Sequence, residues 1–170
     1  IRMVAQNPFI AENTKVRRRL SPTLTAAAAP ERFDSVDEGE LWRKLEQSTV
    51  PGEVAQLATQ YLARFPKSRL AASAEVARDG ALEADKALLS NDVRLYKSAF
   101  VMPQDNEAVR DDLRKASRGD KDASARIARW YIKGDAGLSK DTNRYEGWMQ
   151  YAAALGNGIA CYELALYYRN

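Results

Sequence analysis

The amino-acid sequence predicts an all-α protein: a solenoid of antiparallel helix pairs with an extended arm at its N-terminus. Three observations support this fold class. Alanine is abundant and β-branched residues are sparse, a composition that favours helices by intrinsic propensity. Apolar residues follow helical spacing through residues 54–65, and residues 119–170 contain one pattern twice. We expect residues 1–34 to be an arm or linker and residues 35–170 to be a helical-repeat domain.

The N-terminal 34 residues show no sustained helical periodicity. Three prolines and scattered apolar side chains are typical of a linker or flexible tail. We expect this segment to lie extended along a partner or a neighbouring copy, and packing on its own chain is the alternative. The expected anchors are Phe9, Ile10, Val16 and Leu20, and the basic run expected to meet an acidic surface is Arg17, Arg18 and Arg19.

Residues 35–102 contain amphipathic helices that do not match one another clearly. Ser35 with Glu38 forms a possible capping box at the first helix. Pro51 suits the first turn of the second helix, whose apolar residues recur at i, i+3, i+4 and i+7. Pro66 should end that helix, because the residue before a proline avoids helical dihedrals.

The next helix carries alanines along one narrow face over residues 70–88. Gly80 should weaken it by about 1 kcal/mol relative to alanine. Residues 41–75 are weakly similar to tetratricopeptide-type units that contain "Tyr-Leu-x-x-Phe-Pro-x-Ser". Trp42 and Tyr61 are then expected to pack between helices, and lining a peptide groove is the alternative. A further helical face is expected to follow, carrying Val93, Tyr96, Ala99 and Phe100.

The C-terminal third of the chain repeats itself. A shift of 37 positions places Gly119 on Gly156, and the surrounding residues match in kind. Self-similarity at a period of roughly 20–50 residues is typical of helical arrays whose units bury their apolar faces on one another. The other matched pairs are Ala116 with Ala153, Asp120 with Asn157, Ala123 with Ala160, Ile127 with Leu164, Ala128 with Ala165, Trp130 with Tyr167 and Tyr131 with Tyr168.

These residues resemble the Sel1-like repeat, a relative of the tetratricopeptide repeat. The pattern departs from that family at Ala128 and Ala165, where glycine is usual, and at Tyr151, where lysine is usual. The resemblance implies antiparallel helix pairs and a scaffold or adaptor role, often in bacteria, and it implies no catalytic residue. Over residues 116–170 it is carried by Ala123, Ile127, Tyr131, Gly134, Gly137, Leu138, Asp141, Trp148, Ala152, Ala153, Gly156, Asn157, Ala160, Leu164 and Tyr168.

Residues 104–118 are expected to form a helix that joins the two parts, with Asp105 as its cap. The adjacent Asp111 and Asp112 point in different directions on a helix, so they cannot share a proton or a metal. We expect both carboxylates to face solvent. The segment 134–137 is interpreted as the turn between helices of the repeat rather than as a phosphate-binding loop.

The second repeat stops at Asn170, after its first helix. Arrays need polar units at their ends to stay soluble, yet the last helix carries the adjacent Tyr167 and Tyr168. We therefore expect these tyrosines to contact another chain or to mark a place where the chain continues. The first residue, Ile1, suggests a fragment or a processed form.

The composition argues against catalysis. The sequence holds no histidine, which excludes histidine-based zinc sites, Ser-His-Asp triads and histidine general bases. The single cysteine, Cys161, is expected to be a small buried core residue. The net charge of +3 is too small to indicate nucleic-acid binding, and no apolar run approaches the ~20 residues of a membrane span. We expect no enzymatic activity and no cofactor.

The predicted function is a non-catalytic scaffold or adaptor in a larger assembly. Bacterial cell-envelope machinery, for secretion, pili, flagella or polysaccharide, is the setting that the repeat resemblance implies, with a lean towards the periplasm. The expected partners are several other proteins in a multi-subunit complex, or further copies of this chain. The alternative is a stand-alone regulatory module that binds peptides.

Overall fold

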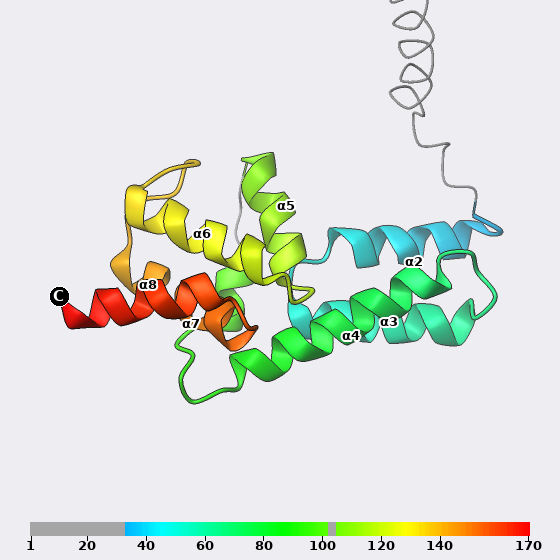
Figure 1. Cartoon of the computed structure of the whole chain (residues 1–170). Coiled ribbons are helices and arrows are strands. Elements are labelled where there is room, and N and C mark those ends of the chain that lie inside the picture. Colours follow the sequence, from blue (N-terminus) through cyan, green and yellow to red (C-terminus); the bar gives the residue numbers. More distant parts are fainter. Residues whose placement is uncertain (1–32, 102–104) are drawn as a thin grey trace, which may run out of the picture. The chain divides into compact units, whose positions relative to one another are not determined.

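The structure, a computed structural model, describes residues 33–101 and 105–170, and every regular element in these ranges is a helix (Figure 1). The prediction of an all-α fold is confirmed for this part of the chain. The predicted arm, with anchors Phe9 to Leu20 and the basic run Arg17–Arg19, lies outside the described residues. The elements are α2 (Val36–Gln47), α3 (Pro51–Arg64), α4 (Ala71–Leu88), the 3-10 helix η1 (Lys97–Phe100), α5 (Glu107–Ala116), α6 (Lys121–Lys133), α7 (Thr142–Ala154) and α8 (Gly158–Arg169).

Helices α2, α3 and α4 pack in chain order, α2 on α3 and α3 on α4. The hydroxyl of Ser35 accepts a hydrogen bond from the backbone N–H of Glu38 at 3.1 Å, which confirms the predicted cap of α2. Pro51 is the first residue of α3, as predicted. The rings of Trp42 and Tyr61 lie 5.2 Å apart, and both side chains are buried. They therefore pack the helices together.

A buried carboxylate ties the start of α2 to the end of α3. The side chain of Glu38 is 3% exposed, and its Oε1 accepts hydrogen bonds from the hydroxyls of Tyr61 and Ser68, each at 2.6 Å. Its Oε2 accepts the N–H of Asp34 at 3.1 Å. The hydrogen bonds from Ser68 and Tyr61 lower the pKa of Glu38, although burial alone would raise it.

Replacing Glu38 by glutamine is expected to lower the free energy of unfolding by about 1–3 kcal/mol at neutral pH, because a charged acceptor is lost. The folded-state pKa of Glu38 lies below its unfolded value of about 4.3. The carboxylate therefore stabilises the fold above that pH, and its contribution is lost as the pH falls through the folded-state pKa. Urea unfolding from neutral to acidic pH should show the wild type and the Glu38→Gln variant converging. A gap that widens on acidification would contradict this role.

The connection between α4 and α5 differs from the prediction. The expected helical face over residues 93–100 is wrong, since only η1 forms there, and Tyr96 is exposed. The backbone of Arg94 explains the difference: its N–H donates to the side-chain oxygen of Gln150 at 2.8 Å. Its carbonyl oxygen lies so near Gly147 that a Cβ there would be 2.7 Å away. Contacts with α7 thus take up backbone groups that a helix would have paired internally.

In the C-terminal half, α5 packs on α6, α6 on α7 and α7 on α8. The buried ring of Trp148 lies 4.8 Å from Phe100, and Tyr151 meets the same Phe100 edge-on at 5.6 Å. The hydroxyl of Tyr151 donates to the carbonyl of Ala116 at 2.7 Å, and burial raises the pKa of this tyrosine. Aromatic rings from α7 and η1 thus fill the core next to the end of α5.

The two copies seen in the sequence begin with the same local structure. Gly119 and Gly156 both have left-handed backbones, with φ of +82° and +92°, a conformation that glycine adopts without steric cost. The next residues, Asp120 and Asn157, cap α6 and α8 with side-chain oxygens that accept backbone N–H groups. The shift of 37 positions therefore relates equivalent turns and caps as well as similar residues.

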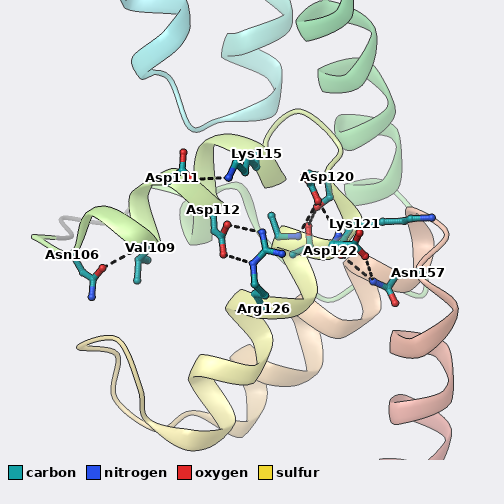
Figure 2. A network of polar contacts seen from close by, with 12 residues as sticks. Asn106, Val109, Asp111, Asp112, Lys115, Asp120, Lys121, Asp122, Arg126 and Asn157 are labelled. Atoms are coloured by element: carbon teal, nitrogen blue, oxygen red, sulfur yellow. Dashed lines mark hydrogen bonds and ion pairs between the residues drawn. The ribbon is translucent and has the colours of Figure 1, made fainter. Parts of the chain in front are cut away.

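Polar contacts join α5 to α6 in ways that the sequence did not indicate (Figure 2). Asp112 was expected in solvent, but its side chain is buried and accepts two hydrogen bonds from Arg126, at 2.8 and 2.9 Å. The ion pair with Arg126 therefore holds Asp112 between α5 and α6. The cap of α5 is Asn106 rather than the predicted Asp105, and its side chain accepts the N–H of Ala108 at 2.9 Å.

Two close contacts connect helices α2 and α4 with the turn between α5 and α6. The backbone of Gly80 in α4 passes so close to that turn that a Cβ on Gly80 would lie 2.2 Å from the carbonyl oxygen of Arg118. The guanidinium of Arg118 donates to the carbonyls of Leu45 at 2.6 Å and Ser48 at 3.1 Å, at the end of α2. It also donates to the carbonyl of Arg114 at 2.8 Å, in the last turn of α5.

Candidate protein-interaction surface

One side of α8 carries apolar and aromatic side chains in solvent. Helical spacing places four exposed residues together there: Cys161, Tyr162, Ala165 and Tyr168, which we call the outer face of α8. Tyr162 is 64% exposed and Tyr168 is 58% exposed. Ala160 and Leu164 of the same helix are buried in the molecule.

The matched residues of α6 have the opposite environment. The shift of 37 positions pairs the outer face of α8 with a set of α6 residues that are all buried. Helices α5 and α7 both pack on α6, and the start of α7 contacts Tyr131 of this set. The buried set is Ser124, Ala125, Ala128 and Tyr131. The outer face of α8 is therefore exposed, whereas the residues of α6 that match it in the repeat are buried between helices.

Helix α8 is held in place next to α6. Asn157 donates from its amide to the carbonyl of Lys121 at 3.3 Å and to the carboxylate of Asp122 at 3.0 Å (Figure 2). Further along, the guanidinium of Arg129 and the carboxylate of Glu163 form an ion pair at 2.7 Å. These contacts join α8 to α6.

The two predicted tyrosines at the end of α8 differ in their contacts. The ring of Tyr167 meets Tyr145 of α7 edge-on, with centroids 5.4 Å apart. The hydroxyl of Tyr168 donates to the carboxylate of Glu146 at 2.6 Å and accepts from the side-chain amide of Gln150 at 2.8 Å. Partial burial and the hydrogen bond to Glu146 raise the pKa of Tyr168. Its ring is thus fixed against α7 while one side remains in solvent.

A pocket of about 590 Å³ lies beside the Tyr168 ring. Its charged lining groups are Asp92, Arg94 and Glu146, and Leu164 contributes apolar surface. The backbone N–H of Arg94 is bound to Gln150, which also donates to Glu146 at 3.2 Å. The segment before η1 and the helix α7 therefore form a polar wall next to the outer face of α8.

The predicted repeat residues separate into core and turn positions. Gly137 and Gly156 lie in exposed turns, and Ala153 is half-buried. The others form the interior, namely Ala123, Ile127, Tyr131, Trp148, Ala152, Ala160 and Leu164. These residues therefore build the fold, and they contribute no exposed side chain to the candidate surface.

Sequence reasoning missed part of the surface and misplaced one residue. Cys161 was expected to be buried, but it is exposed, because nothing in the described structure covers α8 as α7 covers α6. Tyr162 was not among the predicted contact residues, which were Tyr167 and Tyr168. The repeat shift could have found it, since its match, Ala125, lies on the side of α6 where small residues gather.

The described residues show two further properties. No three His, Cys, Asp or Glu side chains among them gather so that they could hold a metal ion. None of the described helices combines the length and apolarity that crossing a bilayer requires.

Comparison with known proteins found no matching family model, no matching curated protein and no matching solved structure.

Proposed function

We propose that this protein is a non-catalytic scaffold that binds other proteins through the outer face of α8. One observation carries the proposal: Tyr162 and Tyr168 are exposed at positions whose matches, Ala125 and Tyr131, lie in a helix interface. Burying a large apolar or aromatic side chain contributes about 1.5–3 kcal/mol. Tyrosine is also among the residues that dominate binding energy at protein interfaces.

We further propose that the helices form an array of the solenoid type. The contacts of Asn157 with Lys121 and of Arg129 with Glu163 join the equivalent helices α6 and α8, which supports this arrangement. The hydroxyl of Tyr151 in α7 reaches the last residue of α5, its equivalent helix. In such an array each unit presents the surface on which the next unit packs. The Sel1-like interpretation of residues 116–170 is part of this proposal.

A photo-crosslinking amino acid at position 162 tests the proposed scaffold function in cells that naturally produce the chain. We expect a discrete protein adduct from position 162, and we expect no such adduct when the same amino acid replaces Tyr96. Tyr96 is a matched control because it is also an exposed tyrosine, but it lies outside α8. The crosslinked protein would be identified by mass spectrometry and purified.

Binding of the purified partner then completes the test. Tyr162→Asp should weaken its affinity at least tenfold, since a charge would replace an aromatic contact. Tyr96→Asp should leave the affinity within about twofold. The proposal fails if position 162 yields no adduct, or if both substitutions change affinity equally.

A further inference from the structure

We infer that the bond between Asn157 and Gly158 is a site of spontaneous deamidation, which the packing of α8 on α6 suppresses, and that the product weakens the attachment of α8. Asn157 is the sole asparagine of the sequence that precedes a glycine. The backbone nitrogen of a glycine attacks a preceding asparagine most readily, because glycine has no side chain to hinder the approach. This reaction goes beyond the proposed scaffold function and does not depend on it.

The reaction needs only water besides the chain itself. The backbone nitrogen of Gly158 attacks Cγ of the Asn157 side chain, forming a C–N bond and closing a five-membered succinimide ring. The bond between Cγ and Nδ2 breaks, and the amide nitrogen leaves as ammonia with the proton of the Gly158 N–H. Water then adds to one of the two ring carbonyls and opens the ring, which leaves aspartate or isoaspartate at position 157.

The fold does not require a glycine at position 158. Gly158 is the exposed first residue of α8, and among the described residues a Cβ there would meet nothing within 4 Å. Gly80 and Gly119 differ, because each allows a close approach of two backbones. The first N–H groups of a helix also have no partner inside the helix. The attacking nitrogen is therefore unhindered, and only the asparagine side chain must move for the reaction to start.

The side chain of Asn157 is held by groups of both α6 and α8. Its Oδ1 accepts the N–H of Ala160 at 2.9 Å and so caps α8. Its Nδ2 donates to the carbonyl of Lys121 at 3.3 Å and to the carboxylate of Asp122 at 3.0 Å (Figure 2). Both ends of the amide are thus fixed, and the residue is 6% exposed. Its Cγ can turn towards the nitrogen of Gly158 only when α8 opens away from α6.

An aspartate at position 157 would keep the cap of α8 and lose the contacts with α6. Asp120, the match of Asn157, caps α6 with a carboxylate, and aspartate caps helices as well as asparagine does. A carboxylate cannot donate, so it would repel the carbonyl of Lys121 and the charge of Asp122. Isoaspartate also carries the main chain through the side-chain carbon, which displaces the carbonyl that accepts the N–H of Cys161. Each product therefore weakens the attachment of α8.

Mass spectrometry of the whole chain, incubated at pH 8 and then digested, tests the protection by the fold. In concentrated urea the peptide that contains Asn157 should deamidate first, and in the folded chain it should react at least twentyfold more slowly. Gly158→Ala should slow the reaction in urea at least fivefold, because the added methyl group hinders the attacking nitrogen. Gly52→Ala, the same substitution in the first turn of α3, should leave the rate in urea unchanged.

Arg129→Met tests whether α8 must open for the reaction. Arg129 forms an ion pair with Glu163, which joins α6 to α8 further along the helix and does not touch Asn157. Its loss should raise the deamidation rate of the folded chain at least twofold and leave the rate in urea unchanged. Arg78→Met is the control, because Arg78 bonds only within α4, to the adjacent Asp79.

Hydrogen exchange measures the attachment of α8 in a mimic of the product. Asn157→Asp should speed exchange in residues 160–168 at least threefold and leave exchange in α3 unchanged. Asn143→Asp, the same change at an exposed position in the first turn of α7, should leave α8 unaffected. Adding Asp122→Asn to Asn157→Asp exchanges donor and acceptor, so it should restore most of the protection.

Three results would overturn the inference. Equal deamidation rates of Asn157 in the folded chain and in urea would show that the fold does not protect it. Faster reaction of another asparagine in urea, such as Asn91, would show that the site is wrongly assigned. Unchanged exchange of α8 in Asn157→Asp would show that the product does not weaken its attachment. The scaffold function is tested separately by crosslinking from position 162, so either proposal can fail alone.

Discussion

Gly80→Ala is expected to lower the free energy of unfolding by about 3 kcal/mol, because the added Cβ has no room in this fold. Alanine in the middle of a solvent-exposed helix would normally stabilise it by up to about 1 kcal/mol relative to glycine. At this position the added Cβ would lie 2.2 Å from the carbonyl oxygen of Arg118. That atom belongs to the backbone and cannot rotate away, so α4 or the turn after α5 must move.

The contact is tight from both sides. A Cβ on Gly119 would lie 2.9 Å from the carbonyl oxygen of Gly80, and Gly119 also has a left-handed backbone. Two glycines thus allow α4 and the turn to approach at backbone distance. Urea unfolding followed by far-ultraviolet circular dichroism measures the effect.

Gly52→Ala is the matched control. Gly52 lies in the first turn of α3, where an added Cβ would find its nearest atoms at 3.7 and 3.8 Å, an ordinary contact distance. This variant should be neutral or more stable by about 0.5 kcal/mol. The explanation is wrong if both alanine variants change stability in the same direction.

Arg118→Met is expected to cost about 3 kcal/mol. Its guanidinium donates to the carbonyls of Leu45 and Ser48, near the end of α2, and to that of Arg114, near the end of α5. Hydrogen bonds to a charged group contribute about 1.5–3 kcal/mol each when they are shielded from water. The cation also faces the negative ends of two helix dipoles. Methionine retains most of the apolar stem and removes only these interactions.

The state of Arg118 follows from its surroundings. Burial lowers the pKa of its guanidinium, and the neighbouring Arg114 acts in the same direction. Arginine nevertheless keeps its charge at every pH at which the protein would be studied. Stability lost in the Arg118→Met variant should therefore be the same from pH 5 to pH 9 and should not fade on further acidification as the effect of Glu38→Gln does.

Two controls accompany this prediction. Arg118→Lys keeps the charge but loses the planar fork, so it should recover only part of the stability. Arg78→Met should change stability by less than about 0.5 kcal/mol, since Arg78 bonds at the surface with the adjacent Asp79. Equal effects of Arg118→Met and Arg78→Met in urea unfolding would show that the contacts of Arg118 do not join the helices.

The apolar stripe from Val54 to Phe65 predicted α3 correctly, because helical spacing puts those side chains on one side whatever they pack against. The cap at Ser35 and the first-turn Pro51 were predictable for the same reason, since both act on their own backbone. The repeat shift correctly anticipated equivalent turns at Gly119 and Gly156. Each of these features depends on residues within a few positions of one another.

Other features depend on distant residues, and the sequence pattern did not show them. Gly80 was predicted to destabilise its helix. In the structure its backbone contacts the turn at Arg118, nearly forty positions away, where a side chain would not fit. Asp112, next to Asp111, was predicted to face solvent. It is buried instead, because Arg126 in the next helix donates hydrogen bonds to its carboxylate. The segment around Arg94 carried an apolar pattern with helical spacing, and its bonds to α7 keep it from forming an α-helix.

By itself the sequence determined the helical class, the starts of α2 and α3 and the shift that relates α6 to α8, because propensity, capping and apolar spacing are visible in the chain itself. Only the tertiary structure decided which copy of the repeated face is covered. Side chains at matched positions have the same local pattern, but Ala128 is buried among other helices and Ala165 is exposed to solvent. Burial depends on what lies across the interface, and that information is absent from either copy alone.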